Sequence, residues 1–336
     1  MRAHIGANMD IYHDSDADLN VLKGKRIAVL GYGAQGRAQA LCLHDSGLDV
    51  TVGARTDGAS WNKVKEDGLK VATIPDAVKG ADVVMMLLPD EVQPDIYKEM
   101  VQPNMKKGSA LEFAHGFSIT YKLIDPPEGI DVIMMAPKSP GDMERIAFLE
   151  GFGVPALISV YRDSTGNAKK IALALAKGIG STRAGVFETS FDFETKSDLF
   201  GEQAVLCGGV TAMIKAGYET LREGGYPPEI AYFEVLHEVK LIVDLIQAGG
   251  FSKMWYVVSN TAEFGGLTRR DRVITEESKK GMRSILADIE SGKFKDEWRA
   301  EWRNGLKELK RMEADDAALE LETVGKEIRA LFERKK

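Results

Sequence analysis

The chain has 336 residues, of which 44% are hydrophobic and 28% charged, and its formal net charge is −7. This balance is typical of a globular protein long enough for two domains. The acidic charge argues against nucleic acid or an anionic membrane surface as a partner. No segment has the length and apolarity of a transmembrane helix, and the opening MRAHIGANMD lacks the apolar run of a signal peptide. We expect residues 1–8 to form a loose extension.

The two cysteines, Cys42 and Cys207, lie in apolar helical contexts without the spacing of a metal or disulfide motif. We interpret both as buried, reduced thiols. Reduced thiols fit a cytoplasmic location.

Between residues 25 and 186, apolar runs typical of strands alternate with helix-like segments. Continuous apolar runs indicate strands that are covered by helices on both faces. The alternation predicts a mostly parallel, doubly wound α/β sheet of the Rossmann type. The predicted strands are Arg26–Leu30, Val50–Gly53, Val83–Leu88, Ala110–Phe113, Val132–Ala136, Ala156–Val160 and Thr182–Val186.

From Lys196 onward the pattern is helical only, with breaks expected at 224–228, Gly249-Gly250 and Phe264-Gly265-Gly266. The charged tail from Ser291 carries apolar residues at helical spacing, which predicts an amphipathic helix packed on its own domain or on a partner chain. These residues are Trp298, Trp302, Leu306 and Leu309. We predict an α/β domain at residues 9–190 and an all-α domain at residues 191–336.

The first predicted strand leads into Gly31-Tyr32-Gly33-Ala34-Gln35-Gly36, and a helix-like segment follows. Gly31 allows a tight turn, Gly33 lets the backbone approach a pyrophosphate, and Gly36 permits close packing of helix on strand. The helix N-terminus offers N–H groups and a positive dipole end to phosphates. Because the motif opens the first unit of a long alternating series, we interpret it as a dinucleotide site rather than a structural turn.

The end of the second strand bears on which nicotinamide coenzyme binds. Asp57 lies where an acidic residue would accept hydrogen bonds from the ribose 2′-OH of NAD and repel a 2′-phosphate. Arg55 and Ser60 act in the opposite sense, because a guanidinium and a hydroxyl can hold that phosphate. Arg55 can equally stack on adenine. We predict use of NADH with some tolerance for NADPH, and we count Gly58 of the same turn among the coenzyme contacts.

The loop after the third strand should lie at the carboxyl ends of the strands, beside the nicotinamide ribose. Its candidate coenzyme contacts are Asp90, Glu91, Val92 and Gln93. An ordinary polar loop is the alternative.

Two pairs of carboxylates, Asp198 with Glu202 and Glu234 with Glu238, lie in otherwise apolar, helix-like sequence. Residues four apart share one helical face, so each pair aims two carboxylates in one direction. Packing two such faces together would be costly without a cation between them, and oxygen ligands suit Mg²⁺ or Mn²⁺. We predict a divalent metal site, with a pair of solvated helix faces as the alternative.

Taken in order, these stretches resemble ketol-acid reductoisomerases (acetohydroxyacid isomeroreductases) of the short class. The chain is too short for the long class, in which the helical domain is duplicated. The matching motifs lie at 11–18, 31–36 (GYGAQG), 87–91 (LLPDE), 113–117 (FAHGF), 136–141 (APKSPG), 198–203 (DLFGEQ), 232–238 (YFEVLHE) and 259–263 (SNTAE).

The resemblance implies a Mg²⁺-dependent alkyl migration in 2-acetolactate, followed by hydride reduction to 2,3-dihydroxyisovalerate. The same steps would convert 2-aceto-2-hydroxybutyrate to 2,3-dihydroxy-3-methylvalerate, so the activity belongs to valine, leucine and isoleucine biosynthesis. A knotted, all-helical C-terminal domain assembled with a second subunit is also implied, which makes the expected protein a homo-oligomer.

By the same resemblance the four carboxylates bind two Mg²⁺ ions. Asp198 would bridge both ions, Glu202 would complete one, and Glu234 and Glu238 would bind the other. Gly141 would join the coenzyme contacts.

Three further residues would take part in the reaction. Lys138 would assist proton transfer, with a surface lysine as the alternative. His115 would lie near the nicotinamide, although by spacing alone it is a structural hydrogen-bonding residue. Ser259, from the same or a neighbouring subunit, would bind the substrate carboxylate, with an ordinary helix cap as the alternative.

The sequence departs from the family pattern at a few positions. Asp57-Gly58 replaces a usual Gly-Ser, which removes a phosphate-binding hydroxyl and adds negative charge. His13 stands where a second Tyr is common, and residues after about Glu297 match poorly. Only the first of these departures bears on the coenzyme.

Two other classes of protein share some of these features. A metal-independent β-hydroxyacid dehydrogenase would combine a similar domain with helices and a catalytic lysine, but it leaves the four carboxylates unexplained. The second class is not an enzyme but an NAD-sensing regulator or scaffold. A regulator of DNA would need a basic reading helix, and no such cluster stands out. We therefore expect small-molecule substrates, and neither nucleic acid nor membrane as a partner.

Overall fold

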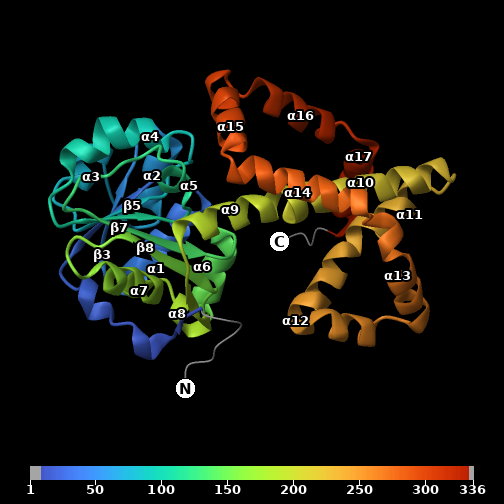
Figure 1. The fold of residues 1–336 in the computed structure, drawn as a ribbon, viewed down its shortest axis with the longest axis horizontal. Coiled ribbons are helices and arrows are strands. Elements are labelled where there is room, and N and C mark those ends of the chain that lie inside the picture. The colour runs from blue at the N-terminus through green and yellow to red at the C-terminus, as the bar shows by residue number, and fades with distance from the viewer. Residues whose placement is uncertain (1–8, 333–336) are drawn as a thin grey trace. The chain divides into compact units, whose positions relative to one another are not determined.

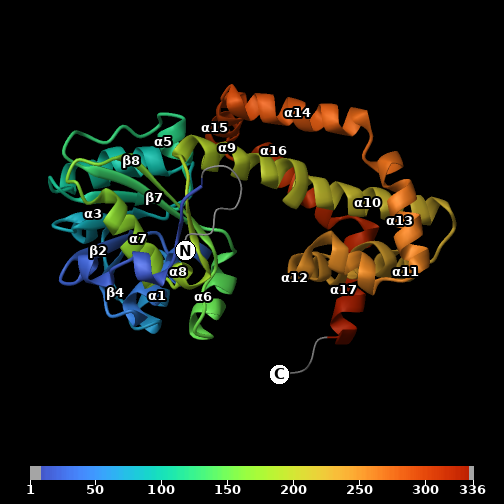
Figure 2. The ribbon, with the colours of Figure 1, turned by 60° about the horizontal axis from the view of Figure 1, so that its bottom comes forward.

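The computed structural model describes residues 9–332, so the expectation for residues 1–8 lies outside the described residues. The chain divides into two compact units, with the boundary between Ser197 and Asp198. Figures 1 and 2 show the first unit in blue to yellow-green and the second in yellow to red. No helix among the described residues is long and apolar enough to cross a membrane.

A nine-stranded sheet forms the centre of the first unit, in the order β1-β9-β8-β7-β6-β5-β2-β3-β4. Neighbouring strands are parallel from β7 through β4, whereas β8 pairs antiparallel with β7, and β1 antiparallel with β9. The prediction of a mostly parallel sheet is confirmed. The strands are β1 (Ile11–Tyr12), β2 (Arg26–Leu30), β3 (Asp49–Gly53), β4 (Lys70–Ala72), β5 (Val83–Met86), β6 (Ala110–Phe113), β7 (Asp131–Pro137), β8 (Ala156–Arg162) and β9 (Val186–Glu188).

One predicted strand is wrong. Ser181–Ala184 form the short helix α8, and β9 begins only at Val186. Gly180 and Gly185 flank α8 with φ of 86° and 134°, conformations that favour glycine and redirect the chain on either side of the helix. The strands β1 and β4 were not predicted, because runs of two and three residues are too short to show a pattern.

Helices cover both faces of this sheet (Figure 2). One core joins apolar residues of α1 and α7 to one face of the strands, and a second core joins α3 and α5 to the other face. Val29 belongs to the first core and Leu30 to the second, as expected for a strand buried on both sides. The helical segments are η1 (Asp14–Asp16), η2 (Leu19–Leu22), α1 (Ala34–Asp45), α2 (Ala59–Glu66), α3 (Ile74–Val78), α4 (Gln93–Ile96), η3 (Tyr97–Val101), η4 (Gln102–Asn104), α5 (Phe117–Thr120), α6 (Gly141–Leu149), α7 (Ala168–Gly178) and α8.

Three carboxyl side chains are fully buried in this unit: Glu112 on β6, Asp131 on β7 and Glu144 on α6. Glu112 accepts a hydrogen bond from the Met135 N–H at 3.3 Å, whereas neither carboxyl oxygen of Glu144 has a hydrogen-bond partner among the described residues. Burial raises the pKa of Glu144 to about 8. Burial and the nearby Glu144 also raise the pKa of Glu112 well above its ordinary value. Glu144 is therefore mainly neutral at pH 7.

The second unit contains helices and no strand within residues 198–332, as predicted. Two of its segments, η5 and η6, are π-helical turns, which are wider than α-helical turns. The segments are α9 (Phe191–Gly201), which begins in the first unit, then η5 (Glu202–Leu206), α10 (Gly208–Glu223), α11 (Pro228–Tyr232), η6 (Phe233–His237), α12 (Val239–Val257), α13 (Asn260–Val273), α14 (Glu276–Glu290), α15 (Lys293–Arg303), α16 (Lys307–Ala317) and α17 (Glu320–Phe332).

Two of the three predicted helix breaks are confirmed. The break at 224–228 separates α10 from α11, and Gly250, with φ of 71°, kinks α12. The break predicted at 264–266 is wrong, because α13 runs through both glycines. The single amphipathic tail helix is also wrong, since Gly305 and Leu306 take positive φ and separate α15 from α16.

Candidate functional site

The glycine loop between β2 and α1 is shaped by contacts that exclude side chains. Gly31 has φ of 97°, and a Cβ there would lie 2.5 Å from the Leu87 carbonyl oxygen. A Cβ on Gly36 would lie 2.4 Å from the carbonyl oxygen of Gly31, which explains the tight approach of α1 to β2. Gly33, the N-cap of α1, has open space around its Cα. The loop therefore leaves backbone accessible where a pyrophosphate would lie.

Two side chains of this loop form hydrogen bonds within the protein. The Gln35 Nε2 donates to the Ser139 carbonyl oxygen at 2.7 Å, and the Tyr32 hydroxyl donates to Asp67 at 2.9 Å. A Cβ on Gly141 would lie 2.2 Å from the Ala34 carbonyl oxygen, so the start of α6 packs directly on the loop. Gly141 is thus brought to the predicted coenzyme site, where its lack of a side chain permits this packing.

The turn after β3 carries the residues that were predicted to read the adenine ribose. Arg55 and Asp57 are exposed, Gly58 is the N-cap of α2, and Ser60 lies in the first turn of that helix. In the described chain, the side chains of Arg55, Asp57 and Ser60 form no hydrogen bond or ion pair with protein groups. All three remain available to a ligand at this edge of the sheet.

The loop after β5 is held by Gln93, which is buried. Its Nε2 donates to the Leu88 carbonyl oxygen at 2.8 Å and to the Asp90 carboxylate at 3.3 Å, while its Oε1 accepts from the Ser118 hydroxyl at 2.8 Å. Gln93 therefore stabilises the shape of this loop. Glu91 and Val92 are half-buried in the same loop.

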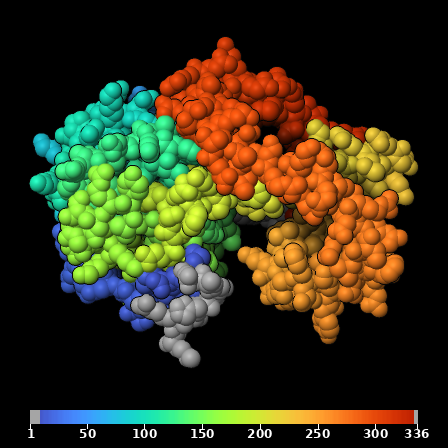
Figure 3. All heavy atoms as spheres, in the orientation of Figure 1, coloured from blue at the N-terminus to red at the C-terminus, as the bar shows by residue number. Residues whose placement is uncertain are grey.

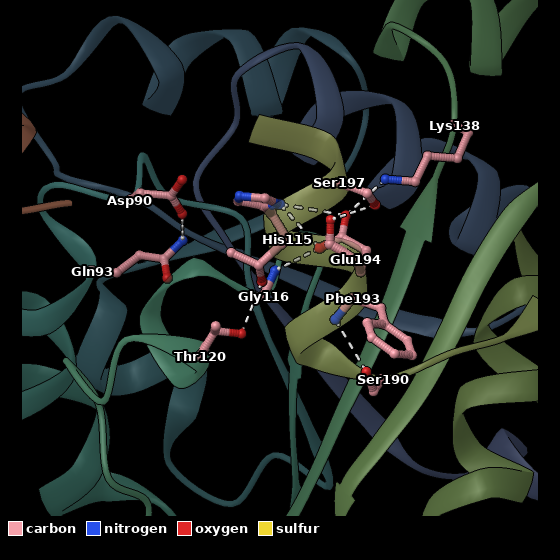
Figure 4. A network of polar contacts seen from close by, with 11 residues as sticks. Asp90, Gln93, His115, Gly116, Thr120, Lys138, Ser190, Phe193, Glu194 and Ser197 are labelled. Carbon is pink, nitrogen blue, oxygen red and sulfur yellow. Dashed lines mark hydrogen bonds and ion pairs between the residues drawn. The ribbon is translucent and has the colours of Figure 1, made fainter. Parts of the chain in front are cut away.

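His115 and Lys138 meet at a third residue, Glu194 (Figure 4). The Lys138 Nζ lies 2.7 Å from Glu194 Oε1, and the His115 Nδ1 lies 3.1 Å from Glu194 Oε2. The Gly116 backbone N–H donates to the same carboxylate at 3.1 Å. His115 follows β6 and Lys138 follows β7, so adjacent parallel strands deliver both side chains to one edge of the sheet.

Glu194 reaches this position because α9 packs closely against Gly116. The Ser190 hydroxyl accepts from the Phe193 N–H at 3.1 Å near the start of α9. A Cβ on Gly116 would lie 2.3 Å from the Thr195 hydroxyl oxygen, so only glycine admits the helix at this distance. The first turn of a helix also favours an acidic side chain such as Glu194.

The Glu194 carboxylate is charged although its side chain is only 1% exposed. Burial alone would raise its pKa, but the hydrogen bond and charge of His115 and the charge of Lys138 hold the pKa at about 2. A buried anion thus fixes the Lys138 ammonium and the His115 ring in one place. The sequence prediction missed Glu194. The sequence does contain a hint of its role, because Glu194 lies on the same helical face as the buried residues Phe191, Thr195 and Leu199.

The four predicted metal ligands lie on helices of the second unit. Asp198 is half-buried one turn beyond Glu194 on α9, and Glu202, Glu234 and Glu238 are exposed. Both pairs adjoin π-helical turns, since Glu202 begins η5 and Glu238 follows η6. Within residues 9–332, no three of these four carboxylates come together as ligands for one ion. Within the described part of one chain, the four carboxylates therefore do not surround a single ion.

The remaining predicted residues of this unit have local roles. The Ser259 hydroxyl accepts from the Ala262 N–H at 3.2 Å as the N-cap of α13, which matches the alternative weighed for it. His237 is exposed and its ring contacts Phe233 and Phe332. Cys42 is buried as predicted, but the prediction for Cys207 is wrong, because it is exposed at the start of α10.

The fold and the glycine loop together define a class. The loop opens a doubly wound sheet at the point where the strand order reverses, between β2 and β5. Coenzymes bind such sheets outside the carboxyl ends of the strands at this switch point. The His115–Glu194–Lys138 cluster lies at the carboxyl ends of the next strands along, β6 and β7. The first unit is that of an oxidoreductase that uses a nicotinamide dinucleotide.

Comparison with known proteins gives the particular family. Residues 21–185 match the family model described as "Acetohydroxy acid isomeroreductase, NADPH-binding domain". Residues 191–334 match "Ketol-acid reductoisomerase, C-terminal domain". The second match extends to residue 334, so the expectation that residues after about Glu297 depart from the family is wrong.

Similar proteins agree with both matches. The chain is 54% identical to "Ketol-acid reductoisomerase (NADP(+))" of Methanothermobacter thermautotrophicus, over 96% of this chain and 98% of the relative. It is 55% identical to the protein of the same name from Methanocaldococcus jannaschii, over 96% and 97%. A solved NADH-preferring ketol-acid reductoisomerase from an uncultured archaeon is 49% identical, with a TM-score of 0.94 over 97% of this chain and 100% of that one. The chain belongs to the ketol-acid reductoisomerase family.

Proposed function

We propose that the chain catalyses the Mg²⁺-dependent alkyl migration and reduction of 2-acetolactate, and of 2-aceto-2-hydroxybutyrate. The observation that carries the proposal is the buried Glu194 carboxylate, which holds Lys138 at 2.7 Å and His115 at 3.1 Å beside the predicted coenzyme edge. An ammonium and an imidazole held on one anion are suited to moving protons at substrate oxygens. Family membership supports this chemistry for the site.

The coenzyme would lie along the carboxyl ends of five adjacent strands, β3, β2, β5, β6 and β7. The turn after β3 would meet the adenine ribose, and the glycine loop after β2 would meet the pyrophosphate. The loop after β5, with Asp90, would face the nicotinamide ribose. His115, after β6, would then lie beside the nicotinamide ring.

The proposed reaction has two stages that need proton transfer. In the first stage, the tertiary hydroxyl of the substrate loses a proton, the alkyl group moves to the neighbouring ketone carbon, and the former ketone oxygen gains a proton. In the second stage, a hydride from the reduced nicotinamide adds to the new ketone carbon, and its oxygen takes up a proton. Lys138 would donate hydrogen bonds and protons to these oxygens. Glu194 would act as a positioning residue, because its carboxylate orients the ammonium of Lys138 and the ring of His115.

Asp198, Glu202, Glu234 and Glu238 would hold the two divalent ions. When bound, such ions polarise a ketone oxygen and stabilise a neighbouring alkoxide. The donor set fits Mg²⁺, because all four ligands are carboxylates. Glu234 and Glu238 make no side-chain hydrogen bond or ion pair within the described residues, so their oxygens are available to an ion.

We further propose that a second copy of the chain completes this site. The two carboxylate pairs do not gather within the described residues of one chain. The second unit also exposes large apolar side chains, among them Phe251 and Tyr256 on α12, which are 69% and 90% exposed. Figure 3 shows atoms of α12 and α13 (orange) at the surface of the unit. Exposed apolar area of this kind is typical of a protein–protein interface. A homodimer, alone or within a larger assembly, would cover it.

For the coenzyme we propose NADH, with tolerance for NADPH. Asp57 is exposed on the turn that would meet the adenine ribose, and its charge would repel a 2′-phosphate. The exposed Arg55 on the same turn would keep NADPH binding measurable. The similar structure described as NADH-preferring supports this proposal, whereas the curated relatives are named for NADP⁺.

The decisive experiment follows oxidation of NADH with 2-acetolactate, with Mg²⁺ and after chelation by EDTA, and repeats both with NADPH. We expect turnover with Mg²⁺, loss of turnover with EDTA and recovery on adding Mg²⁺. Equal turnover without a divalent ion would refute the metal site. A hundredfold higher kcat/KM with NADPH would refute the coenzyme proposal and leave the reaction intact.

A further inference from the structure

Three side chains from separate parts of the first unit meet beside the glycine loop. Tyr32 is the second residue of that loop, Arg37 lies in the first turns of α1, and Asp67 directly follows α2. The Tyr32 hydroxyl donates to Asp67 Oδ2 at 2.9 Å. The Arg37 Nε donates to Oδ2 at 2.6 Å and its Nη2 to Oδ1 at 2.9 Å. One carboxylate thus receives three hydrogen bonds.

This contact is stronger than an ordinary surface ion pair. Its carboxylate is only 12% exposed, and the guanidinium approaches it with two parallel hydrogen bonds. The hydrogen bonds from Arg37 and, to a smaller extent, from Tyr32 hold the pKa of Asp67 at about 2, against the effect of burial. Burial and Asp67 raise the pKa of the Tyr32 hydroxyl, so this group stays a donor. The cluster therefore keeps the same charges at any pH used for an assay.

Asp67 joins two elements that a dinucleotide must touch together. Tyr32 lies between Gly31, whose backbone is fixed against Leu87, and Gly33, around which there is open space. Asp67 ends the helix α2, and the opposite end of α2 begins at the turn with Arg55, Asp57 and Ser60. The carboxylate thus sets the spacing between the loop for the pyrophosphate and the turn for the adenine ribose.

We propose that Asp67 is a positioning residue for coenzyme binding, which holds the glycine loop and α2 at the separation that a dinucleotide requires. The inference rests on the coenzyme site proposed above, and it assigns a role to three side chains that do not touch the reacting atoms. Arg37 is held by Asp67 and is therefore not free to move to the coenzyme phosphates. A preorganised loop binds more tightly because less order is lost on binding.

The role predicts equal effects on NADH and NADPH, since both carry the same pyrophosphate and ribose spacing. The variant Asp67→Asn keeps the size of the side chain but removes its charge and its symmetric pair of acceptors. We expect it to raise the Kd of both coenzymes about tenfold, by fluorescence titration of the full-length protein. The KM for coenzyme should rise in parallel, whereas kcat at saturating coenzyme should change less than twofold. Tyr32→Phe should raise both Kd values by a smaller factor.

The matched control is Asp45→Asn, on the same helix α1. Asp45 receives the Arg145 Nη2 at 2.6 Å, but this pair ties the far end of α1 to α6 and lies away from the glycine loop. If ion pairs of α1 act only on stability, both variants should lower Tm and neither should change Kd. We expect the Asp45 variant to bind both coenzymes as the unaltered protein does.

Three outcomes would overturn the inference. They are unchanged Kd values in the Asp67 variant, equal losses in the Asp45 variant, and a change for NADPH alone, which would indicate a charge effect at the 2′-phosphate. Should Asp67→Asn fail to fold, Tyr32→Phe and Arg37→Lys apply the same test, and unchanged Kd in both would reject the role. If the unaltered protein binds neither coenzyme, the proposed coenzyme site fails instead.

Discussion

Replacing Glu144 by glutamine should change the unfolding free energy in a pH-dependent way. Relative to the unaltered protein, the variant should become more stable as the pH rises. Glu144 is fully buried and its carboxyl oxygens have no hydrogen-bond partner among the described residues. Its pKa is about 8 in the folded chain, against an ordinary value of 4.5. The folded protein therefore binds one more proton than the unfolded chain between these two values, and its stability falls as the pH rises through that interval.

The size of this effect follows from the two pKa values. Each pKa unit corresponds to about 1.4 kcal/mol, so the carboxyl group costs roughly 3 kcal/mol of stability between pH 5.5 and pH 8.5. Glutamine does not titrate and removes that loss. The unfolding free energy of Glu144→Gln, relative to that of the unaltered protein, should therefore rise by roughly 3 kcal/mol from pH 5.5 to pH 8.5, whatever the difference at pH 5.5.

Urea denaturation at fixed protein concentration, at intervals from pH 5.5 to pH 8.5, measures this difference. Groups remote from Glu144 titrate alike in both proteins and cancel in the comparison, whereas Glu112, whose pKa Glu144 raises, does not cancel fully. Glu150→Gln is the control, because Glu150 follows the same helix but is exposed. If the curves of unfolding free energy against pH run parallel for Glu144→Gln and the unaltered protein, the buried carboxyl group is not held neutral, and the reasoning fails.

Three further predictions concern the reaction site. Asp198→Asn should lower kcat more than a hundredfold, while Asp192→Asn on the same helix should not; near-normal turnover at saturating Mg²⁺ would reject Asp198 as a ligand. Glu194→Gln should lower kcat at least tenfold with little change in coenzyme Kd, because it removes the charge that orients Lys138 and His115; an unaltered kcat in steady-state assays would contradict this. Gly116→Ala should lower stability by about 1–3 kcal/mol, because its Cβ would lie 2.3 Å from the Thr195 hydroxyl oxygen. Gly265→Ala, which has nothing within 4 Å, should lower Tm much less, and equal losses in the two variants would argue against close packing at Gly116.

Much of the first unit could be read from sequence because its signals are local. In the strand Arg26–Leu30 the residues from Ile27 onward form a continuous apolar run, and Gly31 and Gly36 after it are required because a Cβ would lie 2.4–2.5 Å from backbone oxygens. The segment around Thr182 was misread because its β-branched residues favour a strand. The glycines at 180 and 185 decide the local structure there, through positive φ.

The site was harder to predict where it depends on tertiary contacts. Glu194 looks like an ordinary helix residue until α9 is packed on Gly116, which brings its carboxylate to His115 and Lys138. Nor does spacing reveal that the hydroxyl of Tyr32 reaches Asp67, 35 residues further along the chain. In the second unit, spacing identified both carboxylate pairs but gave no sign of the wide turns beside them.

The wide turns at 202–206 and 233–237 affect the direction in which the acidic side chains around them point. An α-helix rotates by about 100° per residue, so one additional residue in a turn changes the direction of everything that follows it. Deleting an apolar residue such as Val205 or Leu236 would keep all four acidic residues in the chain, but it would rotate the residues after the deletion relative to those before it. The number of residues in these turns therefore matters to the proposed metal site as much as their identity, and an insertion or deletion there should disrupt that site.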